Sequence, residues 1–195
     1  MSNKWGSVPR ADKDSDIRVH LFVSRNKDNQ DVSGFKSRKK AFVAYDSEDE
    51  ASRTKFKNFV REGVEGEFCR HYVSVNARYP EKVRRAVIHK LVDGADFVGM
   101  DRLVASEAAN PGCAKTWKWM FDFDCDDLDK LLEFSRDIHS FGNFPDNTLA
   151  FYFTPHGFAA IVPYGFDTRE LLEKWGSVAT LKRDGMLIVD WARKA

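Results

Sequence analysis

Short stretches in which apolar and polar residues alternate recur along the chain, and this period of two is typical of a β-strand with one buried face. Seven segments are predicted as strands: Ile17–Ser24, Lys40–Asp46, Cys69–Asn76, Trp117–Asp124, Leu149–Phe153, Phe158–Val162 and Gly185–Trp191. Trp117–Asp124 (WKWMFDFD) gives the strongest signal, because aromatic side chains suit a half-buried pleated surface.

Between these strands, apolar residues recur every three or four positions, which indicates amphipathic helices. Helices are predicted between Ser47 and Gly63, over Pro80–Val92, around Arg102–Ala109, over Asp126–His139 and from Asp167 to Trp175. The apolar stripe of the fourth helix is assigned to Leu128, Leu131, Leu132 and Ile138. Strands and helices interleave, often as β-α-β, which predicts an α/β or α+β sandwich. Residues 1–16 are polar and lack periodicity, so we expect a flexible arm followed by a single domain over residues 17–195.

Composition limits the class of protein. Hydrophobic residues make up 43% of the chain and aromatic residues 13%, which supports a packed core and excludes a wholly disordered protein. No stretch approaches the roughly 18 apolar residues of a membrane span, and the first residues contain no apolar signal core. We therefore expect a cytoplasmic protein without a membrane partner. The three cysteines lie far apart, which predicts reduced thiols rather than a disulfide framework.

Charge is balanced overall, with 31 Lys and Arg against 30 Asp and Glu, so a uniformly basic nucleic-acid binder is excluded. Affinity for nucleic acid would need a local patch. Four cations stand within five positions and cannot all pair with neighbouring acids: Lys36, Arg38, Lys39 and Lys40. Together with Lys82 and Arg85 on the predicted helix Pro80–Val92, they are predicted to form a surface that contacts a nucleic-acid backbone.

Asp122 and Asp124 are the strongest candidates for chemistry. Alternate residues of a strand share a face, so both carboxylates are predicted to project together while Phe121 and Phe123 pack on the other side. Two carboxylates at a strand end form an oxygen site suited to Mg²⁺ or Mn²⁺. The alternative is that the whole acidic run marks the start of the next helix, where the helix dipole favours acids. That alternative explains residues 126–129 but not Asp122 and Asp124.

Two other segments place polar side chains at strand ends. Ser74–Arg78 closes a predicted strand before a basic helix, where an Asn and an Arg would suit a phosphate or nucleotide, although a solvated helix face is the alternative. Thr154–Phe158 (TPHGF) is predicted as a turn between two strands. A glycine in such a turn lets the backbone approach a ligand, and His156 can donate to a phosphate, although most such turns are only turns.

Taken in order, these segments resemble the archaeo-eukaryotic primase superfamily, in particular the small primase–polymerases that phages and plasmids encode. The similar succession is a strand ending in a V-N-x-R type segment, a hydrophobic strand ending in D-x-D, a T-x-x-G-aromatic-His segment that runs into an apolar strand, and a late acid on a final strand. Here these are Ser74–Arg78, Met120–Asp124, Thr154–Val162 and Asp190. The resemblance covers about residues 70–191.

The resemblance implies a primase–polymerase-like core in which an RRM-like sheet and a second small α/β module form a cleft around the carboxylates. It also implies metal-dependent nucleotidyl transfer, with Asp122, Asp124 and Asp190 as catalytic acids. Asp122 and Asp124 would hold Mg²⁺ or Mn²⁺. The phosphates of a nucleotide triphosphate would be contacted by Arg78, Thr154 and His156.

Ala159 departs from the family's pattern, which has a histidine here that is thought to contact the phosphates of the incoming nucleotide. The departure leaves three interpretations of function open. The chain is a nucleotidyltransferase, or a non-catalytic phage-type binding or inhibitor protein on the same fold, or a metal-dependent nuclease that uses the same carboxylates. In the second case the partner is a nucleotide, a nucleic acid or a host protein.

Overall fold

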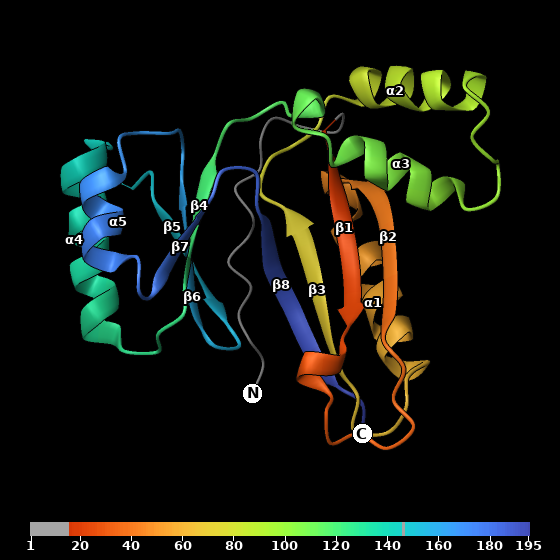
Figure 1. The fold of residues 1–195 in the computed structure, drawn as a ribbon, viewed down its shortest axis with the longest axis horizontal. Coiled ribbons are helices and arrows are strands. Elements are labelled where there is room, and N and C mark those ends of the chain that lie inside the picture. The colour runs from red at the N-terminus through yellow and green to blue at the C-terminus, as the bar shows by residue number, and fades with distance from the viewer. Residues whose placement is uncertain (1–15, 146) are drawn as a thin grey trace. The chain divides into compact units, whose positions relative to one another are not determined.

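The computed structural model describes residues 16–145 and 147–195. Over these residues the chain is mixed α and β and divides into two compact units, which are described separately. Unit 1 consists of the described part of Met1–Thr116 together with Ile188–Ala195, and unit 2 is Trp117–Leu187. Each unit has its own antiparallel four-stranded sheet (Figure 1). The mixed α/β class is therefore confirmed.

The arm predicted over residues 1–16 lies outside the described residues except for its last member. Asp16 is buried, and its carboxylate accepts a hydrogen bond from the Lys115 ammonium. Its backbone carbonyl accepts a hydrogen bond from the amide of Asp46. At Asp16 the chain is already anchored in unit 1.

Unit 1 contains a sheet with the strand order β2-β1-β3-β8. Its strands are β1 (Ile17–Ser24), β2 (Arg38–Tyr45), β3 (Phe68–Ser74) and β8 (Met186–Arg193). Its helices are α1 (Asp49–Arg61), α2 (Pro80–Val92) and α3 (Met100–Ala108), and it has three short 3-10 turns over Asn26–Asp28, Asp46–Glu48 and Pro111–Cys113. β1 pairs with β2 over its whole length, in the register Ile17 to Tyr45 and Ser24 to Arg38.

Helix α1 packs on one face of this sheet through Phe56 and Phe59. Strand alternation brings Phe22 and Phe42 to that face, where the Phe22 ring lies 5.1–5.6 Å from the rings of Phe42, Phe56 and Phe59. Cys69 is buried in the same cluster, and burial raises the pKa of its thiol to about 11. The three cysteines of the chain are all free thiols, as the sequence predicts.

Two histidines are buried beside these aromatic rings. His20 Nδ1 lies 3.0 Å from His71 Nε2, His20 stacks on Phe42, and His71 meets the edge of Phe22. Because burial disfavours the charged imidazolium, it lowers the pKa of His20 to about 4 and that of His71 to about 3. The positive charges of Arg18 and Lys55 act on His20 in the same direction. Both rings are therefore neutral at pH 7.

Unit 2 has the strand order β5-β6-β4-β7. Its strands are β4 (Trp119–Phe123), β5 (Ala150–Thr154), β6 (Gly157–Val162) and β7 (Ala179–Lys182), and its helices are α4 (Leu128–Gly142) and α5 (Arg169–Trp175). Asp127 caps α4, because its carboxylate accepts hydrogen bonds from the amides of Asp129 and Lys130. The prediction that acids mark this helix start is thus correct for Asp127.

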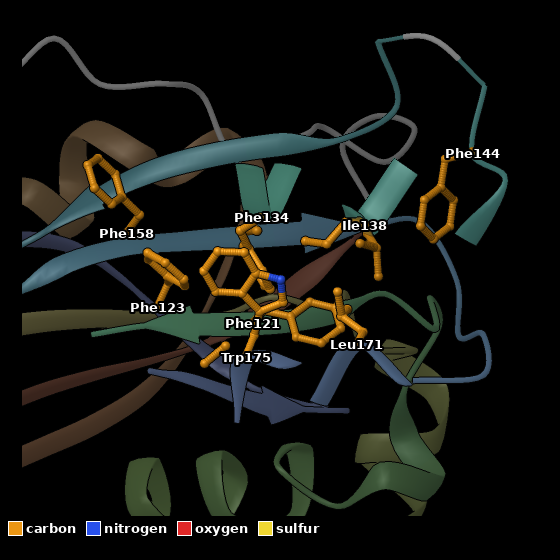
Figure 2. Packing of buried hydrophobic residues seen from close by; sticks show 11 residues of the cluster. Phe121, Phe123, Phe134, Ile138, Phe144, Phe158, Leu171 and Trp175 are labelled. Atoms are coloured by element: carbon orange, nitrogen blue, oxygen red, sulfur yellow. The ribbon is translucent and has the colours of Figure 1, made fainter. Parts of the chain in front are cut away.

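The core of unit 2 is aromatic (Figure 2). Phe121 and Phe123 point from β4 toward Phe134 of α4, with ring centroids 5.7 and 4.9 Å from it. Trp175 of α5 closes the cluster, and its indole N–H donates to the carboxylate of Asp137. Both helices therefore pack on the sheet face that carries Phe121 and Phe123.

The predicted stripe of α4 was wrong at two positions. Leu128 and Leu132 are exposed, whereas Phe134 and Ile138 are buried, with Leu131 partly buried against them. The buried side of α4 contains Phe134 and Ile138 instead of Leu128 and Leu132, because the large Phe134 ring packs against Phe121 and Phe123 of β4. Strand β7 was not predicted, since a four-residue segment with a charged end carries little strand signal. Within the described residues, no helix combines the length and apolar character that a bilayer span requires.

Candidate functional site at the end of strand β4

Asp122 lies on the sheet face opposite Phe121 and Phe123, as alternation predicts, whereas Asp124 follows directly after the end of β4. The residues between and before them, Phe123 and Phe121, are fully buried in the core beneath the helices. Asp122 is partly buried within the sheet, whereas Asp124 is exposed just beyond the strand end. The Asp124 amide donates to the carbonyl of Val178 at 2.8 Å, so its backbone is held while its side chain stays at the surface.

The carboxylate of Asp122 already has a partner. Lys182, at the end of β7, donates its ammonium to Asp122 Oδ2. The pairing of β7 with β4 produces this contact, since Thr180 faces Asp122 and Lys182 is the next residue on the same face. A cation at Asp122 would have to compete with this ammonium, so the two aspartates are not equivalent as metal ligands.

Asp124 lines a pocket of about 510 Å³. The turn between β5 and β6 forms the other wall, and it contributes Thr154 and His156. The remaining lining residues are Cys125, Asp126, Leu128, Phe153, Pro155, Gly157 and Phe158. The structure therefore brings three of the predicted site residues, Asp124, Thr154 and His156, to one hollow within unit 2.

Gly157 explains why the turn can approach the end of β4. Its φ is +148°, and a Cβ added there would lie 2.2 Å from the carbonyl oxygen of Phe123 and 2.8 Å from the amide of Cys125. Since a carbon atom cannot occupy that space, only glycine allows the two backbones to meet. The glycine in the TPHGF segment thus builds the pocket wall, and the approach it allows is to backbone.

The pocket carries acidic groups without a Lys or Arg among its lining residues. Asp124 and Asp126 are both exposed, and Thr154 adds a neutral hydroxyl. An isolated phosphate would be repelled by two carboxylates, whereas a divalent cation would be attracted. The donor set consists of hard oxygen ligands, which Mg²⁺ and Mn²⁺ prefer.

Protein groups alone do not complete such a site. Across residues 16–145 and 147–195, no cluster of three or more His, Cys, Asp or Glu side chains is placed to hold a metal ion. Mg²⁺ is commonly bound by one or two carboxylates, while waters and substrate phosphates fill the other positions. Asp124 and Asp126 are the two carboxylates of the pocket lining that could hold such an ion.

Ala159 lies directly opposite Asp122 in the pairing of β6 with β4. Side chains at paired positions of neighbouring strands have Cβ atoms about 4.5–5.5 Å apart, so a histidine at position 159 would stand beside the first aspartate. Ala159 is only 1% exposed, however. The surrounding residues leave space for the methyl group of alanine only, so an imidazole at this position would force its neighbours to move.

Two other predicted site residues belong to unit 1. Arg78 is 2% exposed, and its backbone forms isolated β-bridges to Ile17 and Ala114. Asp190 lies on β8, where its carboxylate accepts a hydrogen bond from the amide of Trp191. Burial raises the pKa of Asp190, although Arg53 and Lys57 oppose the shift. Both residues are thus set into the body of unit 1.

The predicted basic surface contains one residue with a structural role. Arg38 donates to Glu67 Oε1 at 2.6 Å and to the carbonyl of Phe59 at 3.0 Å. Burial alone would raise the pKa of Glu67, but the hydrogen bonds from Arg38 and from the Val64 amide outweigh it and lower that pKa. Lys36, Lys39 and Lys40 are exposed. Arg38 is therefore engaged by groups of unit 1 itself.

Lys82 and Arg85 lie elsewhere on unit 1. Helix α2 begins beside Tyr45, because Pro80 and Val83 line the same apolar groove as Tyr45. Lys39 lies six residues before Tyr45 on β2, so at about 3.3 Å per residue it is roughly 20 Å from Tyr45 and from the start of α2. The Lys82 ammonium donates to the carbonyl of Gly112 and lies over the Tyr79 ring. The six cations thus form two separate areas.

Sequence reasoning missed three contributors to the site. Lys182 had no signal, because its contact with Asp122 depends on the pairing of β7 with β4. Asp126 was assigned to the helix start, yet it lines the pocket while Asp127 provides the cap. Phe153 was predicted only as a residue of the strand that ends beside Thr154, yet its side chain is 73% exposed and lines the pocket.

Comparison of the chain with protein-family models, with curated proteins and with solved structures finds no match. The functional argument therefore depends on the geometry of the site.

Proposed function

We propose that the pocket of unit 2 binds a nucleotide triphosphate together with Mg²⁺ or Mn²⁺, as a protein of the nucleotidyltransferase (primase–polymerase) type. The observation that carries this proposal is the meeting of Asp124, Thr154 and His156 around one hollow. Asp124 comes from the end of β4, whereas Thr154 and His156 come from the turn between β5 and β6, and each was assigned to metal or phosphate binding from the sequence.

The chemistry of the lining supports a metal–phosphate complex over either component alone. Asp124 and Asp126 attract a cation, and the bound cation in turn neutralises phosphate charge that the carboxylates would repel. The Thr154 hydroxyl and the His156 ring are the groups able to donate hydrogen bonds to phosphate oxygens. The divalent ion would supply charge neutralisation and orientation.

Binding without catalysis is favoured by two observations. Asp122 is engaged by Lys182, and Ala159 provides no donor beside it. Two-metal transfer needs carboxylates that bridge or flank both ions, and these contacts leave Asp124 as the freer member of the pair. We therefore infer that nucleotide binding is retained while product formation is weak or lost; a nuclease that uses the same carboxylates is the competing enzyme class.

The experiment compares two variants that remove one carboxylate each. Asp124→Asn changes the pocket at nearly constant volume, whereas Asp101→Asn removes the same charge from an exposed position on α3 in unit 1. Titration of ATP in the presence and absence of Mn²⁺ should show metal-dependent binding by the wild type and by Asp101→Asn. Asp124→Asn should bind at least tenfold more weakly. Equal binding by all three proteins, or none by any, would refute the proposal.

A nucleic-acid strand is proposed as a second ligand, bound by unit 1. The exposed cations Lys36, Lys39 and Lys40 support this, since they stand at the start of β2 and in the loop before it. Contacts of this kind recognise the phosphate backbone and not the base sequence. Incubation with a template, nucleotides and Mn²⁺ distinguishes an extended product, a shortened strand and an unchanged one.

A further inference from the structure

One sheet edge of unit 2 differs from the other edges of the molecule. Strand β5 ends the order β5-β6-β4-β7, so its outer side presents backbone amides and carbonyls that no neighbouring strand of the described sheet uses. Residues 149–154 have the sequence LAFYFT, without charge, proline or glycine. Such a segment combines high β-propensity with an unprotected edge.

The other three edges carry the protection that β5 lacks. Strand β2 begins with Arg38, Lys39 and Lys40, and β8 contains Asp190 and Arg193. Strand β7 is four residues long and ends at Lys182. Charged side chains and short strands prevent unwanted pairing at sheet edges. Strand β5 differs from the other three edges in having no charged residue.

The apolar surface continues beyond the backbone. Phe153 pairs with Phe158, whose ring packs into the core beneath the helices, so Phe151 and Phe153 lie on the helix-bearing face of the sheet. Phe153 is 73% exposed and Phe151 37% exposed. On α4, Leu128 and Leu132 are also exposed, and Leu128 shares the pocket lining with Phe153.

We propose that β5 pairs antiparallel with β5 of a second copy of this chain, which joins two four-stranded sheets across a two-fold axis. Identical uncharged strands meet without like-charge repulsion, and antiparallel pairing uses the same donors and acceptors on both sides. Phe153 and Phe151 are 73% and 37% exposed, so together they can bury about the area of one whole aromatic side chain, about 150–250 Å² per copy. Leu128, Leu132 and the paired backbone of both copies would supply the remainder of the roughly 1,000 Å² that a specific interface needs.

Two measurements on the full chain test this pairing. Light scattering over about 1–100 μM, the range in which a moderately stable dimer dissociates, should give twice the 22.4 kDa chain mass at the upper end. Amide hydrogen exchange should show protection of residues 149–154 that increases with protein concentration. A monomer at every concentration would refute the proposal, even if the chain captured another strand-forming peptide at this edge.

The variant Phe151→Lys places at β5 the charge that the other edges carry, and it leaves the lining of the pocket unchanged. Phe97→Lys is the matched control, because Phe97 is an exposed phenylalanine in the connection between α2 and α3. We expect Phe151→Lys to weaken dimerisation at least tenfold and Phe97→Lys to leave it unchanged. A dimer that survives Phe151→Lys, with residues 149–154 exchanging as fast at high as at low concentration, would place the interface elsewhere and overturn the proposal.

Discussion

At the scale of single residues, the buried pair His20 and His71 links the core of unit 1 to pH. Each ring is neutral in the folded chain, because burial holds the pKa of His20 near 4 and that of His71 near 3. In the unfolded chain both rings return to the ordinary pKa of about 6.5. Between about pH 4 and 6.5 the unfolded chain therefore binds protons that the folded chain does not.

The free energy of unfolding should consequently rise with pH across this window and fall on acidification. The loss is at most about 1 kcal/mol per pH unit for each histidine, and it is absent above about pH 7. Urea unfolding at pH 7.5, 6.0 and 5.0 measures it. His71→Gln should reduce the slope, whereas His89→Gln, at an exposed position of α2, should not. Equal slopes for both variants would contradict the assignment.

Gly157 is the residue on which the pocket wall depends. We expect Gly157→Ala to lower the free energy of unfolding by more than about 2 kcal/mol, because the new Cβ would clash with the backbone of Phe123 and Cys125. Gly34 is the matched control: its φ is +69°, but a Cβ there meets nothing within 4 Å. Gly34→Ala should cost about 1 kcal/mol, the backbone strain alone. Denaturant unfolding that ranks the two variants equally would remove the steric argument.

At the scale of elements, the pairing of β7 with β4 brings the Lys182 ammonium to the carboxylate of Asp122. If the ion also contacts Asp122, removing the ammonium in Lys182→Met should tighten Mn²⁺ binding about fivefold, since a unit charge at about 4 Å is worth about 1 kcal/mol in water. The control Lys174→Met removes the same charge from its contacts with Glu133 and Asp137 on α4. Paramagnetic resonance of free Mn²⁺ gives both affinities. A Lys182→Met protein that binds no more tightly than Lys174→Met would show that Asp122 takes no part.

Elements with a clear period were predictable from the sequence, and those that depend on a neighbour were not. Ile17–Ser24 and Pro80–Val92 were predicted with their observed bounds, because each carries its own alternation or helical repeat. The opposed faces of Asp122 and Phe123 followed from strand geometry alone.

The remaining parts of the site depend on contacts between segments distant in sequence. Strand β7 exists through its pairing with β4, and this pairing also brings Lys182 to Asp122. The exposure of Leu132 follows from the way Phe134 fills the core, which a helical repeat of leucines does not reveal. Local periodicity thus gave the framework, while the charge balance of the site required the tertiary structure.

At the scale of the whole molecule, a net charge of +1 conceals an uneven distribution of charge. Exposed Lys36, Lys39 and Lys40 cluster at the start of β2 in unit 1, whereas the pocket of unit 2 is lined by Asp124 and Asp126. A local positive field attracts a phosphate backbone even when the total charge is near zero. Net charge and local charge therefore make different predictions for nucleic-acid binding.

The double variant Lys39→Gln/Lys40→Gln separates the effect of local charge from that of net charge. For single-stranded nucleic acid, each lost phosphate contact should reduce the slope of log K against log salt by about 0.7, which gives about 1.4 for two lysines. Lys57→Gln/Lys130→Gln is the control, because it also changes the net charge from +1 to −1 but removes exposed lysines from α1 and α4. Fluorescence anisotropy of a labelled strand between about 50 and 200 mM salt measures both slopes. If both double variants lose affinity equally, only total charge matters; if the wild type does not bind at 50 mM salt, unit 1 has no nucleic-acid surface.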